Sequence, residues 1–110
     1  AVLCYAMLCY AMLCCAVLST VIKGPVFNSM ARAAYELGAD YFYRLNDDSE
    51  IRGRWPQAYV ATLQGLGPPY GVIGPSSYGS NDRILTHDFV HRTHMDIFEM
   101  NYYPPELPDW

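Results

Sequence analysis

The sequence predicts an α/β protein, a sheet with flanking helices that is preceded by an apolar repeat segment. Segments with a helical spacing of apolar residues alternate with short runs of aromatic and β-branched residues, which is typical of helices that cover a sheet. Polar stretches rich in Gly, Pro, Asn and Asp separate these runs, as expected for turns. The assignable strands and helices would leave much of such a sheet uncovered, so we expect the fold to be incomplete.

Residues 1–20 differ in composition from the rest of the chain. The pentapeptide Leu-Cys-Tyr-Ala-Met recurs there with small variations, and all four cysteines fall inside it. No charged residue occurs from Ala1 to Ile22, so this stretch is a candidate membrane helix or the apolar part of a signal segment. Tandem copies of the base sequence ATGCT would also be translated as this cycle in every frame. We therefore interpret residues 1–20 as a translated simple repeat, with a membrane helix as the alternative.

Residues 21–110 form the second unit, which we interpret as a partial folded domain. It contains no cysteine, so no disulfide framework is expected. The whole chain has a net charge of −4 and no run of basic residues, which argues against a nucleic-acid partner. Contact with a membrane is expected only through residues 1–22.

The first expected helix covers residues 29–37, and a strand follows it. Apolar residues from Met30 to Leu37 fall at helical spacing, with Asn28 as the predicted N-cap and Gly38 as a left-handed stop. The aromatic run "YFYRL", residues 41–45, predicts the strand.

Four further elements are expected along the chain. "RGRWPQAYVATLQGLG" reads as a loop and then a helix, with Pro56 tolerated in the first turn. "YGVIG" predicts a short buried strand, and "RILTHDFVHR" predicts another strand. "THMDIFEM" predicts a short helix capped by Thr93.

An acidic cluster follows the first strand directly. Asn46, Asp47 and Asp48 lie where the chain leaves "YFYRL", and ligands of open α/β sheets bind beyond the carboxyl ends of the strands. Carboxylate and amide oxygens suit magnesium and manganese, and such a cation can screen a diphosphate and stabilise the charge that develops as it leaves. The alternative is a turn in which these side chains cap backbone groups and Glu50 is solvated.

Two long segments carry a family resemblance. "FNSMARAAYELGADYFYRLNDDSEI" and the later "GRWPQAYVATLQGLGPPYGVIGP" resemble the middle of a GT-A-type glycosyltransferase, a nucleotide-diphospho-sugar transferase. The resemblance implies a Rossmann-like mixed sheet and a metal-dependent transfer of a sugar from a nucleotide-diphosphate donor to a hydroxyl acceptor on a glycan or protein. It also implies manganese or magnesium as the cation, and the Golgi or ER lumen of the secretory pathway as the location.

The family's Asp-x-Asp motif falls on Asn46, Asp47 and Asp48. Asp48 would be the metal ligand, and Asp47 would contact the nucleotide or be structural. Asn46 replaces the usual first aspartate, and its amide oxygen can still ligate or accept a hydrogen bond from a ribose hydroxyl. Because the amide carries no charge, we expect a weaker cation site than the family's.

The resemblance leaves the catalytic residue unassigned. The base-binding strands of the family would precede Gly24, and its acidic catalytic residue would follow Trp110. Asp88 and Asp109 are available as the acidic residue that would act as general base, but nothing in the sequence supports either one. We therefore expect this chain to be inactive alone, and a non-catalytic truncated remnant or pseudoenzyme is the alternative interpretation.

Two other sets of residues were considered as sites. His87, His91 and His94 are spaced by four and three, so on a single helix they would share a face and form a zinc-binding module. A strand through these residues would instead separate them. In the family interpretation, His91 or Arg92 contacts the sugar or diphosphate, and Arg52 and Arg54 either pair with phosphate or are solvated charges.

Overall fold

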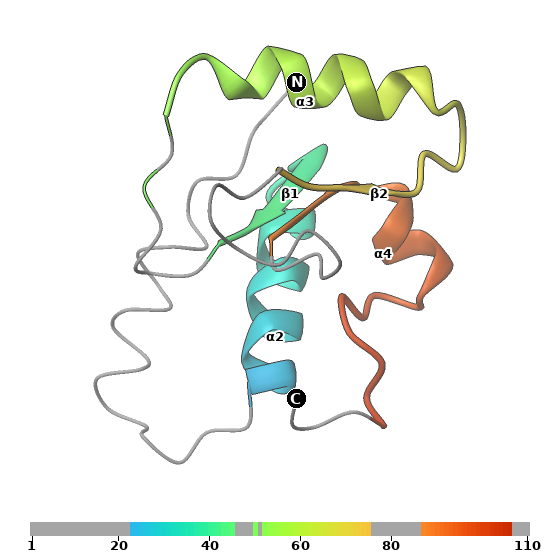
Figure 1. The fold of residues 1–110 in the computed structure, drawn as a ribbon. Coiled ribbons are helices and arrows are strands. Elements are labelled where there is room, and N and C mark those ends of the chain that lie inside the picture. The colour runs from blue at the N-terminus through green and yellow to red at the C-terminus, as the bar shows by residue number, and fades with distance from the viewer. Residues whose placement is uncertain (1–22, 46–49, 51, 76–86, 107–110) are drawn as a thin grey trace.

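The computed structural model describes residues 23–45, 50, 52–75 and 87–106, and the structural statements below concern these residues. The elements, in chain order, are α2 (Lys23–Glu36), β1 (Tyr41–Arg44), α3 (Trp55–Gly65), β2 (Val72–Ile73), β3 (Asp88–His91) and α4 (Thr93–Ile97). In Figure 1, α3 covers one face of a small sheet, and α2 and α4 lie on the other side of it. The predicted mixed α/β class is therefore confirmed. The domain boundary proposed near residue 20 lies outside the described residues.

The described strands form one antiparallel sheet in the order β1-β3-β2. Arg44 of β1 lies opposite Asp88 of β3, and Tyr41 lies opposite His91. Because β1 and β2 are both antiparallel to β3, they run in the same direction, and α3 connects them along the chain. No parallel pair of neighbouring strands occurs within the described ranges, so the described sheet is antiparallel and does not show the mixed sheet that the sequence predicts.

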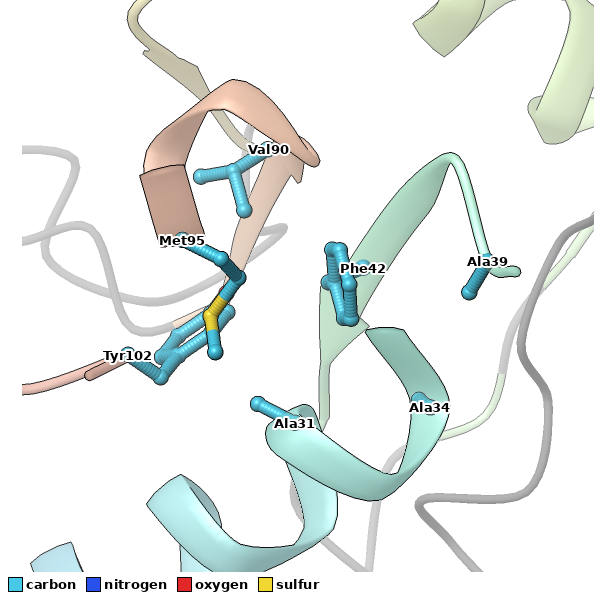
Figure 2. Close-up of a cluster of buried hydrophobic side chains, with 7 residues drawn as sticks. All are labelled: Ala31, Ala34, Ala39, Phe42, Val90, Met95 and Tyr102. Atoms are coloured by element: carbon cyan, nitrogen blue, oxygen red, sulfur yellow. The ribbon is translucent and has the colours of Figure 1, made fainter. Parts of the chain in front are cut away.

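One core cluster lies between the sheet and α2. Phe42 and Val90 point from the sheet toward Ala31 of α2 and Met95 of α4, and all four are 0 % exposed (Figure 2). The small side chain at position 31 lets the helix backbone approach the Phe42 ring closely. Each large side chain buried in this way stabilises the fold by about 1.5–3 kcal/mol.

The other core cluster lies beneath α3 and is mostly aromatic. Side chains alternate between the two faces of a strand, so Tyr41 and Tyr43 point away from Phe42 and toward Leu63 of α3. The ring of Phe89 stacks on Tyr41 at 5.5 Å and meets Tyr43 edge to face at 5.8 Å between centroids. These geometries are the favourable ones for aromatic pairs.

The helix α2 differs from the expectation at its start. It already includes Lys23, so Asn28 lies inside it and is not an N-cap. The Asn28 side chain bonds the backbone of Tyr103 instead, which is a tertiary partner that sequence spacing cannot reveal. The expected stop is confirmed, because Gly38 has a φ of +88°.

Two smaller expectations near the sheet were wrong. Val72 of β2 is 45 % exposed, because α2 packs against β1 and β3 and leaves that side of β2 uncovered. Thr93 is not the N-cap of α4: Arg92 takes that position, and the Thr93 hydroxyl donates to the carbonyl oxygen of Pro69. Pro56 lies in the first turn of α3, as expected.

Candidate functional site

The acidic cluster itself, Asn46, Asp47 and Asp48, lies outside the described residues. The strand predicted before it is confirmed from Tyr41 to Arg44. Leu45 and Glu50 are the nearest described residues on either side.

Three strand ends meet at the edge of the sheet where β1 ends. The register places Arg44 opposite Asp88 and Ile73 opposite Phe89, so β1 and β2 end where β3 begins. We call this the carboxyl-end edge. It is the location at which open α/β sheets bind ligands.

A buried ion pair joins β1 to β3 at the carboxyl-end edge. The Nε–H of Arg44 donates to Oδ1 of Asp88, and the two side chains are only 10 % and 13 % exposed. The hydroxyl of Tyr102 donates to the other carboxylate oxygen of Asp88 at 2.6 Å. Burial, together with the charge of Asp88 and this hydrogen bond, raises the pKa of Tyr102, so its phenol stays protonated and remains a donor.

The C-terminal segment completes this arrangement, which we call the Arg44 cluster (Arg44, Asp88, Tyr102 and Tyr103). The guanidinium of Arg44 lies 5.8 Å from the centroid of the Tyr103 ring. The backbone of Tyr103 is held by α2: Asn28 Nδ2 donates to its carbonyl at 3.0 Å, and its N–H donates to Asn28 Oδ1 at 2.8 Å. Helix α2, the sheet edge and the C-terminal segment are therefore tied together.

This geometry bears on the candidate catalytic acids. Both carboxylate oxygens of Asp88 are engaged, one by Arg44 and one by Tyr102. A general base must reach the proton of its acceptor through a hydrogen bond, and Asp88 is arranged as a structural anion. Asp109 lies outside the described residues.

The three histidines do not converge. His91 packs against the rings of Tyr41 and Tyr70 on the α3 side of the sheet, whereas His94 packs against Tyr102 on the α2 side. Nε2 of His94 donates to the carbonyl of Tyr102 at 2.9 Å. Within the part of the chain that the structure describes, no group of three or more His, Cys, Asp or Glu residues could hold a metal ion. The geometry therefore gives the zinc-module alternative no support.

His91 and Arg92 lie at the amino end of β1, not at the carboxyl-end edge. The backbone N–H of Arg92 donates to the carbonyl of Asp40 at 2.8 Å, and Nη1 lies 3.8 Å from Oδ1 of Asp40. This position follows from the antiparallel pairing of β3 with β1. His91 and Arg92 are therefore separated by the length of β1 from the carboxyl-end edge, and the structure does not place them at a diphosphate site there.

The arginines that follow the acidic cluster lie on the surface. Arg52 pairs with Glu50 at 2.9 Å, and these side chains are 82 % and 73 % exposed. Such pairs contribute little to stability because water and salt screen them. Arg54 is also exposed, so the solvated interpretation fits both arginines.

A pocket of about 210 Å³ lies between α2 and the C-terminal segment. Its lining residues are Gly24, Pro25, Asn28, Ser29, Arg32, Asn101, Pro104 and Pro105. The main polar groups are already engaged: Arg32 donates to the Met100 carbonyl at 2.9 Å and to Asn101 Oδ1 at 2.6 Å. The lining contains no carboxylate, so it offers no charged ligand for a cation.

No helix in the described ranges is long and apolar enough to cross a membrane, and the stretch 1–22 lies outside those ranges. Comparisons with protein-family models, with curated proteins and with solved structures found no match to this chain.

Sequence reasoning missed the Arg44 cluster. One signal was present: Arg44 is a single charge in an aromatic strand, and Asp88 stands at the head of the apolar run "DFVH". Opposite charges on two buried strands favour a cross-strand pair. The contributions of Tyr102 and Asn28 have no comparable local signal.

Proposed function

We propose that residues 21–110 are part of a GT-A-type glycosyltransferase, which moves a sugar from a nucleotide-diphosphate donor to a hydroxyl acceptor on a glycan or protein. The observation that carries the proposal is the position of Asn46, Asp47 and Asp48. They directly follow β1, a fully buried strand that ends at the carboxyl-end edge of an α/β sheet.

The order of the elements supports the same proposal. Helix α2 leads into β1, and α3 then carries the chain to β2, which runs in the same direction as β1. Helices lie on both sides of the sheet, as in α/β proteins that bind ligands at their strand ends (Figure 1). The Arg44 cluster holds the strands at this edge in place, because its contacts join β1, β3 and the C-terminal segment.

A divalent cation fits the donor chemistry of this site. Magnesium is usually held by one or two carboxylates together with substrate phosphates, and manganese takes similar oxygen ligands. Asn46 and Asp48 would supply the protein oxygens, and Asp47 would contact the nucleotide or support the turn. When bound, the cation would supply charge stabilisation for the departing diphosphate.

The direct test is binding of Mn²⁺ to the full chain, alone and with a panel of UDP- and GDP-sugars, measured by calorimetry. We expect Asp48→Asn to weaken Mn²⁺ binding by about tenfold or more, because it removes the charged ligand. The matched control is Glu50→Gln, which removes an exposed carboxylate close by and should change binding less than about twofold. We expect Asn46→Asp to tighten Mn²⁺ binding, since it adds a charged ligand.

The competing candidate is a non-catalytic remnant or pseudoenzyme of the same ancestry. The amide at Asn46 favours it, because a neutral ligand weakens the cation site. If neither the chain nor Asn46→Asp binds Mn²⁺, the metal-dependent proposal is wrong. If Asn46→Asp alone restores binding of the metal and the donor sugar, the chain is a transferase relative that has lost its cation.

A further inference from the structure

The end of β3 contacts the connection between α3 and β2 through one histidine. The ring of His91 lies between the rings of Tyr41 and Tyr70, at 5.2 and 4.7 Å between centroids. Tyr70 has a φ of +74°, in the left-handed region that non-glycine residues rarely occupy. A backbone of this kind persists only where its surroundings hold it in place. The contact with His91 is part of what holds the connection in this conformation.

Two hydrogen bonds extend the contact into α4. The backbone N–H of Thr93 donates to Nδ1 of His91 at 3.3 Å, and the Thr93 hydroxyl donates to the Pro69 carbonyl at 3.2 Å. A backbone N–H can only donate, so this bond requires a lone pair on Nδ1 and places the ring proton on Nε2. We call this arrangement the His91 latch (His91, Thr93 and Pro69). Its bond from the Thr93 N–H exists only with neutral histidine, whereas its bond from Thr93 to Pro69 does not depend on the charge of the ring.

We propose that the His91 latch is an acid-sensitive contact between the end of β3 and the first turn of α4, beside the α3–β2 connection. When Nδ1 takes up a proton it becomes a donor, so it can no longer accept the Thr93 N–H. Thr93 Oγ1 lies 3.2 Å from Nδ1 and becomes the acceptor of the new N–H. The latch thus exchanges one hydrogen bond for another and releases the first-turn amide of α4.

The groups around His91 act in opposite directions on its charge. Burial is the largest influence and lowers the pKa of His91, and Arg92 lowers it further, whereas Asp40 and Asp96 raise it. The aromatic neighbours Tyr41 and Tyr70 contribute to that burial. The net direction favours the neutral ring in the folded chain.

The sign of the pH effect follows from that direction. An unfolded chain takes up a proton on His91 near the ordinary pKa of 6.5, before the folded chain does. The latch therefore contributes its full stability above that pH, and its contribution falls as the pH drops through 6.5 and then through the lower folded value. We expect the first turn of α4 to lose this hydrogen bond over this acid range, and the environment of Tyr70 to change as the His91 ring becomes charged.

The test is a pH titration of the full chain from about pH 7.5 to about pH 5, the range in which histidine changes charge, followed by NMR. The His91 ring signal, the Thr93 amide and the Tyr70 amide should shift together with one apparent pKa below 6.5. The nitrogen shifts of His91 at pH 7.5 should show the Nε2–H tautomer. The protection of the Thr93 amide from exchange, corrected for the intrinsic rate, should fall with the same transition.

Two variants separate the latch from general acid effects. In His91→Gln, the Thr93 and Tyr70 amides should lose the transition, because an amide side chain does not titrate in this range. In His94→Gln, a histidine three residues away is removed and the transition should remain. The proposal is overturned if wild-type Thr93 shows no transition linked to His91, if His91 carries its proton on Nδ1 at pH 7.5, or if His91→Gln keeps the transition.

Discussion

The two ends of β1 each carry an arginine–aspartate pair, and the pairs differ in burial. At the carboxyl end, Arg44 and Asp88 are 10 % and 13 % exposed, and Tyr102 satisfies the second carboxylate oxygen. At the amino end, Arg92 and Asp40 are 30 % and 37 % exposed and 3.8 Å apart. Breaking a buried pair leaves an uncompensated charge, whereas an exposed pair is screened by water and salt. The same residue types therefore form a buried ion pair at one end of β1, and a more exposed pair that contributes less to stability at the other end.

The largest effect is expected from breaking the buried pair. Asp88→Ala leaves the Arg44 charge without its carboxylate and removes the acceptor of the Tyr102 hydroxyl. We expect a loss of about 3–5 kcal/mol in the free energy of unfolding, measured by urea denaturation.

A double variant sharpens that prediction. Replacing both partners by apolar residues, Arg44→Met with Asp88→Leu, removes the buried charges together, so part of the lost stability should return, while the Tyr102 hydroxyl remains without its acceptor. A double-mutant cycle then isolates the coupling between the two side chains. A loss below about 1 kcal/mol in Asp88→Ala would mean that water reaches this edge and that the pair resembles the one at the amino end.

A smaller effect is expected at the bond between α2 and the C-terminal segment. Asn28→Ala leaves the backbone N–H and carbonyl of Tyr103 without these partners, so we expect a cost of about 1–3 kcal/mol. The neighbouring variant Ser29→Ala removes an exposed hydroxyl that bonds only the preceding turn, and should cost less than about 0.5 kcal/mol. Equal costs for the two variants would show that Asn28 does not hold the segment.

The smallest effects are expected at the exposed pairs. Arg92→Met removes the pair with Asp40 and the contact with the Tyr35 ring, and we expect a cost smaller than that of Asn28→Ala, which decreases as salt is added. Glu50→Gln should cost less than about 0.5 kcal/mol. Urea denaturation at low and high salt measures both. A salt-independent cost in Arg92→Met would contradict the comparison between the two ends.

The elements with strong local patterns were predictable from the sequence, and the contacts between them were not. The strand at Tyr41, the helix with Pro56 in its first turn and the strand at Phe89 all follow from spacing and residue type. The misassigned caps have partners far along the chain: Asn28 bonds a residue 75 positions away, and Thr93 bonds one 24 positions away. A side chain with a competing tertiary partner does not behave as its local context predicts.

The candidate site divides in the same way. The position of the acidic cluster after a buried strand follows from the sequence, because one aromatic run and one polar tripeptide define it. The Arg44 cluster requires a pairing over 44 positions between two strands, together with a tyrosine from the C-terminal segment. Because β3 is antiparallel to β1, Arg92 lies at the amino end of β1. Helical or strand periodicity alone could not indicate this position.

We propose that the carboxyl end of β1, and not its amino end, binds a divalent cation. The most direct test adds substoichiometric Mn²⁺ to the isotopically labelled full chain and measures the paramagnetic broadening of each amide signal. We expect strong broadening at Leu45, Glu50 and His87, and little at Ala39 or Arg92. The broadening at the carboxyl end should disappear in Asp48→Asn. If no amide signal is broadened locally, or if the broadening is centred on the amino end of β1, then the carboxyl end of β1 does not bind the cation.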